Sequence, residues 1–307
     1  MTISIVGTND LHGRVLALPL LAGYVANLRA ARAEDGGAAI LVDAGDMFQG
    51  TLESNLVEGA SIVDAYSEMG YAAAAIGNHE FDFGPAGPAV TAAEPGDDPR
   101  GALKAAASRA KFPFLTANTR VASTGAHVDW ANMPASTTVR VAGVSVGIIG
   151  VTTPETATTT IHANVADLSF APLADTVAEE AKKLRASGVD VVVVAAHAGG
   201  KCQSFTGDVA KDHCEAKSEI FDLARALPSG AVDAIVGGHS HAGIAHEVAG
   251  IPIIEQHSYG RAFGRVDLTV SGSPPRVVAH HVFAPQDLCP GQDKPDFTTC
   301  APVAYEG

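Results

Sequence analysis

The sequence contains 307 residues, of which 47% are hydrophobic and 18% are charged, a composition that excludes a disordered, collagen-like or coiled-coil protein. Apolar runs such as residues 191–196 are far shorter than the roughly 18 residues of a transmembrane helix, so we expect no membrane span. The net charge of −14 and the lack of any basic run also disfavour a nucleic-acid polymer as partner.

Short apolar runs alternate with helical patterns along most of the chain. We expect strands over residues 2–8, 39–43, 73–77, 113–117, 190–196, 233–237, 252–256 and 263–270, and an antiparallel hairpin over residues 137–151. We expect helices over residues 17–33, 57–69, 100–110, 172–187 and 216–227. The alternation predicts an α/β fold, and the hairpin indicates mixed strand directions.

The C-terminal segment breaks this pattern. Residues 271–307 contain six prolines and show little periodicity, so we expect one domain over residues 1–270 and a tail or linker over residues 271–307.

The four cysteines form two local pairs, Cys202 with Cys214 and Cys289 with Cys300. Two short-range disulfides would indicate an oxidising, periplasmic or extracellular compartment, and the second would pin the tail. The alternative is four free thiols in a cytosolic protein. No basic leader region precedes the first strand. If the cysteines indicate the compartment correctly, we expect a leader peptide to have been removed.

Side chains of the metal-ligand or acid–base type occur at five strand ends, in residues 9–13, 43–46, 77–82, at His197 and in residues 238–241. Groups outside the carboxyl ends of strands in an α/β sheet converge on one crevice. The sequence therefore predicts one site from nine side chains: Asp10, His12, Asp46, Asn78, His79, Asp82, His197, His239 and His241.

This set predicts a centre of two metal ions. Carboxylate, imidazole and amide oxygen ligands without thiolate suit Mn²⁺, Zn²⁺ or Fe. Seven side chains supply eight ligand bonds if Asp46 bridges the ions, and such a pair clamps a phosphoryl group and activates a bridging hydroxide as nucleophile. His79 would then remain as general acid or charge stabiliser, with Asp82 holding its imidazole.

Each cluster also has an ordinary structural explanation. Residues 78–82 alone would suit an acidic helix start, and residues 238–241 a glycine turn with surface histidines. The occurrence of all five clusters directly after apolar strands favours a single functional site over these separate structural explanations. We expect Trp130 to be a packing residue, and the remaining histidines to be surface or packing residues, although His257 follows a strand.

The segments TNDLHG at residues 8–13, GDMFQGT at 45–51, GNHEFD at 77–82 and GHSH at 238–241 resemble the calcineurin-like metallophosphoesterases. Within them, residues 2–270 resemble the catalytic domain of the bacterial periplasmic 5′-nucleotidase family. The resemblance implies a four-layer α/β/β/α sandwich. It places Asp10, His12, Asp46 and His241 on one ion and Asp46, Asn78, His197 and His239 on the other. His79 and Asp82 match the family's catalytic dyad.

The resemblance also implies a second, C-terminal domain that binds the nucleoside, and we expect that domain to be absent from this sequence. The predicted function is hydrolysis of small phosphate esters, nucleotides first. The alternatives are a cyclic-nucleotide phosphodiesterase, a sulfur-ester hydrolase at a similar centre, and a noncatalytic metal-binding module.

Overall fold

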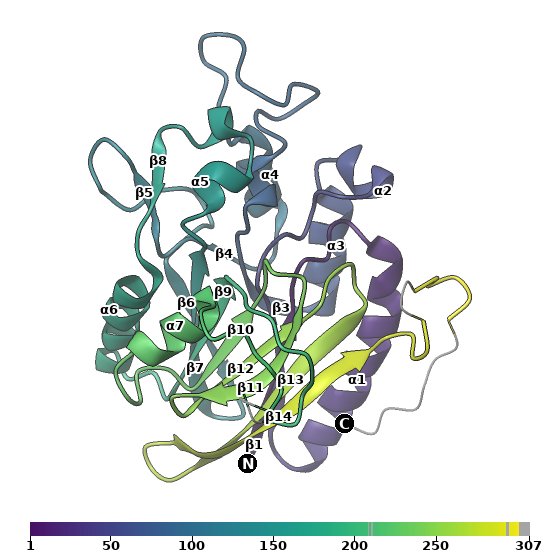
Figure 1. Ribbon diagram of the computed structural model, residues 1–307, viewed down its shortest axis with the longest axis vertical. Coiled ribbons are helices and arrows are strands. Elements are labelled where there is room, and N and C mark those ends of the chain that lie inside the picture. Colours follow the sequence, from purple (N-terminus) through teal and green to yellow (C-terminus); the bar gives the residue numbers. More distant parts are fainter. Residues whose placement is uncertain (208, 210, 293–294, 301–307) are drawn as a thin grey trace.

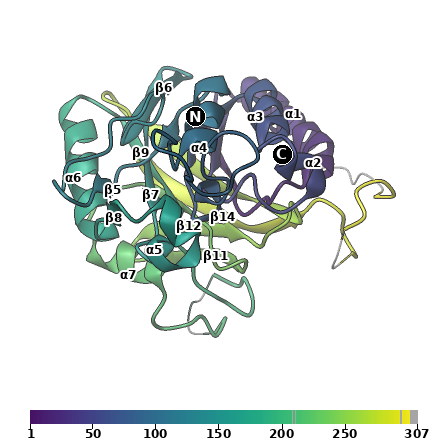
Figure 2. The ribbon, with the colours of Figure 1, turned by 90° about the horizontal axis from the view of Figure 1, so that it is seen from above.

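A computed structural model describes residues 1–207, 209, 211–292 and 295–300. Two six-stranded sheets lie face to face, with helices on both outer surfaces (Figure 1). Viewed from above, α1 (Leu18–Glu34) and α3 (Ala60–Met69) lie on one side of the sheets, and α6 (Leu173–Ala186) and α7 (Glu219–Ala226) lie on the other (Figure 2). The predicted four-layer α/β/β/α sandwich is confirmed.

The first sheet has the strand order β14-β13-β1-β2-β3-β4. Strands β1 to β4 are parallel, whereas β13 and β14 join antiparallel at one side, so the sheet is mixed. The strands are β1 (Thr2–Thr8), β2 (Ala38–Asp43), β3 (Tyr71–Ala75), β4 (Phe114–Leu115), β13 (Ala262–Ser271) and β14 (Arg276–Asp287).

The second sheet has the strand order β11-β12-β10-β9-β7-β6. Its four central strands are parallel, and the outer strands β11 and β6 are antiparallel to their neighbours. The strands are β6 (Ser136–Val141), β7 (Val144–Thr152), β9 (Val191–His197), β10 (Ala234–Gly237), β11 (Gly243–Val248) and β12 (Ile251–Gln256). The predicted hairpin is β6 and β7.

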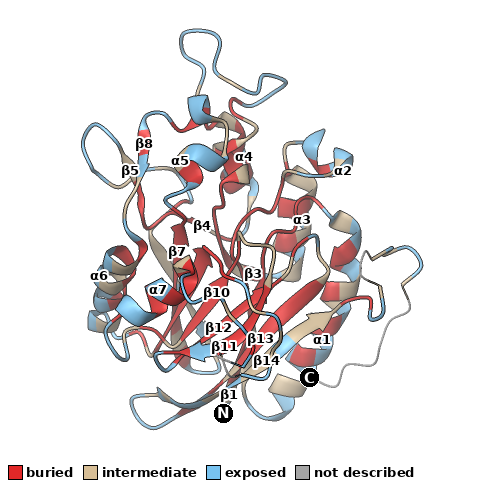
Figure 3. Ribbon diagram, in the orientation of Figure 1, coloured by how far each residue is buried: buried red, intermediate tan, exposed pale blue. Residues whose placement is uncertain are grey.

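Strand β9 shows how side-chain alternation builds the layers. Val191 and Val193 pack between the sheets, whereas Val192 and Val194 pack beneath α6 and α7. Successive side chains of a strand point to opposite faces, so a strand covered on both faces is apolar throughout. Burial is accordingly concentrated in the sheets, while the outer helices alternate between buried and exposed residues (Figure 3).

Shorter elements complete the fold: α2 (Leu52–Asn55), α4 (Gly101–Arg109), α5 (Thr156–Thr159), β5 (Thr119–Val121) and β8 (Leu168–Phe170). Within the described part of the chain, no helix combines the length and the hydrophobicity needed to cross a bilayer.

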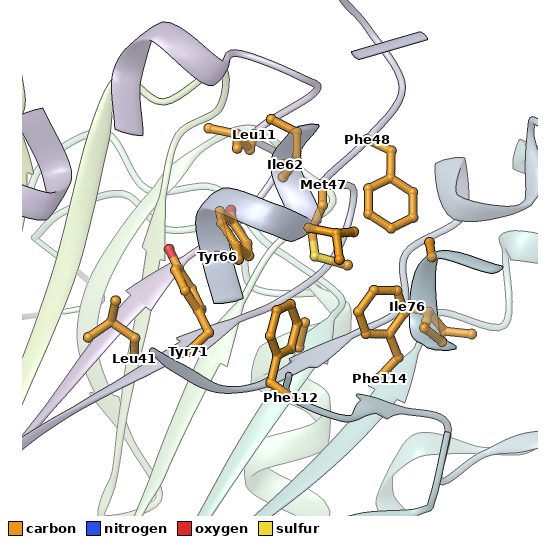
Figure 4. Packing of buried hydrophobic residues seen from close by; sticks show 14 of the residues in the cluster. Leu11, Leu41, Met47, Phe48, Ile62, Tyr66, Tyr71, Ile76, Phe112 and Phe114 are labelled. Carbon is orange, nitrogen blue, oxygen red and sulfur yellow. The ribbon is translucent and has the colours of Figure 1, made fainter. Parts of the chain in front are cut away.

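A buried aromatic cluster lies between the first sheet and its helices, directly behind the second predicted motif (Figure 4). Met47 and Phe48 follow Asp46 in the chain and are almost fully buried in this cluster. The rings of Tyr66 and Tyr71 stack there at 3.9 Å. The loop that carries Asp46 is therefore anchored by apolar burial, which removes its freedom to move.

Two expectations require correction. Residues 276–287, expected in the tail, form β14, a partly exposed edge strand whose weak alternation and Pro285 concealed it. The helix expected from residue 57 begins at Ala60, because Gly59 takes a left-handed conformation with φ 81°. Strand β11 was not expected. The disulfides Cys202–Cys214 and Cys289–Cys300 are both present, as predicted.

Candidate metal centre

The loops that follow β1 and β2 are joined by their backbones. Asp10 N donates to Gly45 O at 2.9 Å, and His12 N donates to Asp46 O at 3.0 Å. Because β1 and β2 are parallel neighbours, their carboxyl ends meet and the loops continue the pairing. This pairing brings the first two predicted motifs together.

Asp10, His12 and His241 form the first group of possible ligands, here named the Asp10 group. His12 Nε2 lies 3.0 Å from His241 Nε2, and His241 Nε2 lies 3.3 Å from Asp10 Oδ1. Asp10 also accepts from the backbone N–H of His239 at 2.9 Å, which fixes the loop after β10 against the loop after β1.

Asp46, His197 and His239 form the second group, here named the Asp46 group. His197 Nε2 lies 3.2 Å from Asp46 Oδ2 and 2.9 Å from Asn78 Oδ1. Asn78 donates its amide N–H to Thr159 O at 3.0 Å, which turns its oxygen toward His197. Asp46 Oδ2 is also 3.9 Å from His12 Nε2, so this carboxylate lies between the two groups.

The donor atoms fit divalent cations. The Nδ1 atoms of His12 and His197 each lie 2.8 Å from a backbone carbonyl, of Gln49 and Ala44 respectively. An Nδ1–H that donates to a carbonyl leaves Nε2 with a free lone pair, which is the usual arrangement of a metal-binding histidine.

The local electrostatics also call for positive charge. Asp10 and Asp46 are buried, and neither forms an ion pair with an Arg or Lys of the described residues. Burial alone would raise the pKa of Asp46, but His197 and His12 outweigh it and hold that pKa well below its usual range. Burial likewise opposes charging of His197, yet Asp46 raises the pKa of His197 to about 10. Buried charges of this kind persist only when paired or bound to metal.

The backbone of the site is strained. Asp10, His12, Asp46, His239 and His241 all have positive φ, between 48° and 77°. Non-glycine residues take this conformation at a cost, and such residues cluster at functional sites where surrounding contacts enforce it.

His79 and Asp82 lie beside these two groups. His79 Nδ1 is 2.5 Å from Asp82 Oδ2, and this hydrogen bond is the main cause that raises the pKa of His79 to about 9. The His79 and His12 rings lie 5.3 Å apart. Thr160 donates to the other oxygen of Asp82 at 2.8 Å, so the carboxylate is held from both sides.

Glu80 has a positioning role that the sequence reading did not assign. It is 1% exposed and accepts from the backbone N–H groups of Asp46, Met47 and Gly77 at 2.6–2.8 Å. It thereby ties the second motif to the third, and burial raises its pKa to about 7. The position of Glu80 inside the third motif was the one indication in the sequence that it has a role in the site. Only the fold shows which backbone atoms its carboxylate contacts.

Asn9 is a second positioning residue that was not predicted. Its amide donates to Asp10 Oδ2 and to His257 O, both at 2.6 Å, and its oxygen accepts from Gln256 N at 2.9 Å. The first motif is thereby joined to the end of β12.

All nine predicted side chains thus lie at one end of the sandwich. Of the other histidines, His246 is buried against Asp212 at 2.7 Å, and His280 pairs with Glu247 at 2.8 Å. His257 borders a cavity beside His241. Trp130 packs against the apolar core beneath Arg100 and Lys104, as expected for a packing residue.

Comparison with known proteins agrees with this geometry. Endonuclease YhcR of Bacillus subtilis is 28% identical over 294 residues, which cover 90% of this chain and 22% of YhcR. Protein UshA of Escherichia coli is 27% identical over 310 residues, covering 92% of this chain and 51% of UshA. The solved 5′-nucleotidase precursor of Thermus thermophilus matches with a TM-score of 0.68 and 25% identity, covering 94% of this chain and 55% of that one.

The chain therefore spans about half the length, or less, of these relatives. A model of the calcineurin-like phosphoesterase family matches residues 3–243, a range that includes all nine predicted site residues. The resemblance seen in the motifs is confirmed: this chain belongs to the calcineurin-like phosphoesterase family.

Proposed function

We propose that the protein uses two divalent metal ions to hydrolyse small phosphate esters, above all nucleotides. Asp10, His12, Asp46 and His241 would hold one ion, and Asp46, Asn78, His197 and His239 the other. The observation that carries the proposal is the position of Asp46, between two groups of converging donor atoms and beside the His79–Asp82 pair.

Mn²⁺, Zn²⁺ or Fe suits this set of oxygen and nitrogen donors. Two such ions, when bound, polarise the phosphoryl oxygens and lower the pKa of water that reaches them. A metal analysis of the purified protein would identify the native ions.

His79 is proposed as the general acid. Because His79 Nδ1–H donates its hydrogen bond to Asp82 Oδ2, Nε2 is the nitrogen left for the substrate. In the reaction a water molecule gives up a proton to solvent and its oxygen forms a bond to phosphorus, while the bond from phosphorus to the ester oxygen breaks. The leaving oxygen takes a proton from His79 Nε2, and solvent then returns a proton to His79. Asp82, itself held by Thr160, keeps the ring oriented and stabilises its charged form.

The nucleotide substrate rests on the relatives whose names describe 5′-nucleotidases, including those of Vibrio vulnificus and Thermus thermophilus. The two disulfides support a periplasmic or extracellular location, because such bonds persist in oxidising compartments. We place the catalytic domain over residues 1–287 rather than 1–270, because β14 belongs to its first sheet.

Hydrolysis of a phosphodiester, such as a 2′,3′-cyclic nucleotide, is the second candidate. The relative YhcR is named an endonuclease, and cleavage of a nucleic acid breaks a phosphodiester bond. The same donor groups would serve either reaction, since both place a phosphoryl group between the ions.

The test compares esters in excess Mn²⁺: 5′-AMP, p-nitrophenyl phosphate, bis-p-nitrophenyl phosphate and 2′,3′-cyclic AMP. Faster hydrolysis of 5′-AMP than of the two diesters supports the proposal, whereas faster diester cleavage favours the second candidate. His79→Ala should lower turnover while both metals stay bound. Loss of metal together with activity would make His79 a ligand and overturn its role as acid. Hydrolysis of none of these esters would overturn the function.

A further inference from the structure

A cavity of about 690 Å³ opens beside the candidate metal centre. It lies among the loops after β1 and β12 and the C-terminal segment, and its walls include Arg14, Leu16, His241, Tyr259, Arg261 and Phe297. Its volume is within the range of small-molecule sites. His241, proposed as a metal ligand, belongs to its wall, so a molecule in the cavity would lie next to the reacting phosphate.

Tyr259 connects the cavity to the centre. Its ring lies 5.3 Å from the rings of both His12 and His241, yet 45% of the residue is exposed. Its backbone is held in a left-handed conformation, with φ 61°, and its N–H donates to Asp10 O at 2.7 Å. An aromatic side chain kept exposed in a strained conformation beside a reaction centre is a candidate for ligand contact.

Phe297 supplies a second aromatic side chain from a distant part of the sequence. It lies within the loop that the Cys289–Cys300 disulfide closes. Leu288, next to that disulfide, is 1% exposed and its N–H donates to Arg261 O at 2.8 Å, which anchors the start of the loop beside the cavity. The tip of Phe297 lies 3.8 Å from the position that a Cβ would take at Gly260. The loop therefore brings Phe297 close to the residue that follows Tyr259.

The charges of the cavity favour an uncharged occupant. The wall contains two arginines, Arg14 and Arg261, and two carboxylates, Glu53 and Asp296, so the formal charge of these four side chains is zero. Arg261 is in addition paired with Asp287 at 3.4 Å. The central carbon of the Arg14 guanidinium lies over the Tyr259 ring, 5.3 Å from its centroid, within the range of a cation–π contact. Exposed apolar surface of Leu16 adds to the rim.

We propose that this cavity is a leaving-group subsite that takes a flat, uncharged aromatic group, such as the base of a nucleoside. It would give this chain a preference for nucleotides over aliphatic phosphate esters from its own residues. The catalytic consequence rests on the proposed function, but the binding of the aromatic group does not, because neither Tyr259 nor Phe297 is a proposed metal ligand.

Binding is tested first, on the full chain after treatment with EDTA, by calorimetric titration with adenosine and with ribose. We expect adenosine to bind and ribose not to bind. Phe297→Leu should weaken adenosine binding about tenfold, within the range that one base–aromatic stack contributes. The matched control is Phe283→Leu, because Phe283 lies on β14 against His281 and Arg265 and is not in the cavity wall. No adenosine binding, or equal weakening in both variants, would overturn the subsite.

Catalysis is tested second, by the ratio of kcat/KM for 5′-AMP to kcat/KM for glycerol 2-phosphate. The ratio should fall about tenfold in Phe297→Leu and stay at the wild-type value in Phe283→Leu. An unchanged ratio in Phe297→Leu would overturn the subsite and leave the proposed function standing. Adenosine binding that depends on Phe297, in a protein that hydrolyses neither ester, would instead overturn the proposed function and leave the subsite standing.

Discussion

Gly77 is the residue at which a single methyl group should disable the centre. It precedes Asn78 and lies against the loop that carries Asp46. A Cβ built on Gly77 would stand 2.1 Å from Asp46 Oδ1 and 2.6 Å from Asp46 N. Both contacts are far below van der Waals distance, and one of them is to backbone, so no side-chain rotation relieves them.

The size of the effect follows from these distances. To accept Gly77→Ala, the Asp46 loop must move by about 1 Å, and displacements of that size lower catalytic rates by about 100-fold. The movement would also disturb the hydrogen bond of 2.9 Å from His79 N to Asp46 Oδ1. We therefore expect kcat/KM to fall about 100-fold and Mn²⁺ to bind more weakly.

The assay measures kcat/KM for p-nitrophenyl phosphate across a Mn²⁺ titration, with thermal unfolding as a check that the variant is folded. Gly23→Ala is the matched control, because Gly23 lies in α1 and a Cβ there would meet no atom within 4 Å. That control should keep full activity and gain roughly 0.5–1 kcal/mol of stability. Wild-type kcat/KM and Mn²⁺ affinity in a folded Gly77→Ala protein would refute the assignment of Asp46 to the centre.

Three further predictions concern the dyad, the metals and a disulfide. Asp82→Asn should lower kcat on p-nitrophenyl phosphate by about 10²-fold or more while metal content stays at the wild-type value, because His79 loses its carboxylate partner; an unchanged kcat would contradict the dyad. EDTA should lower Tm. Mn²⁺ at 100 times its Kd should restore about 2.7 kcal/mol of the free energy of unfolding, because the buried carboxylates regain a cation. A Tm that does not depend on Mn²⁺ would count against the metal centre. Replacing Cys202 and Cys214 by Ser should lower the free energy of unfolding, measured in urea, by about 3 kcal/mol, because the disulfide closes a loop with a sequence separation of 12 residues. No measurable loss would mean that the loop is ordered without the disulfide.

The sequence was sufficient to predict much of the fold because its strands are buried on both faces. Runs such as residues 191–196 are apolar in every position, and they can belong only to an element covered on both sides. Where burial is partial, the signal fails: β14 is an edge strand that exposes part of both its faces, and its composition resembles that of a loop.

The candidate metal centre was likewise predicted from the sequence only in part. The sequence alone placed ligand-type side chains at five strand ends, because the carboxyl ends of parallel strands converge. It did not reveal that Glu80 would accept three backbone N–H groups, since those atoms belong to two different loops.

The cavity depended most on tertiary structure. Tyr259 and Phe297 belong to separate parts of the sequence, and nothing in the sequence around either residue predicts that it lines a cavity. The Cys289–Cys300 bond closes the loop that carries Phe297, and the strained backbone at residue 259 directs the tyrosine to the metal side. Local sequence thus determined the chemistry of the centre, whereas long-range packing decided the shape of the space beside it, because that shape depends on contacts between segments that carry no local signal of one another.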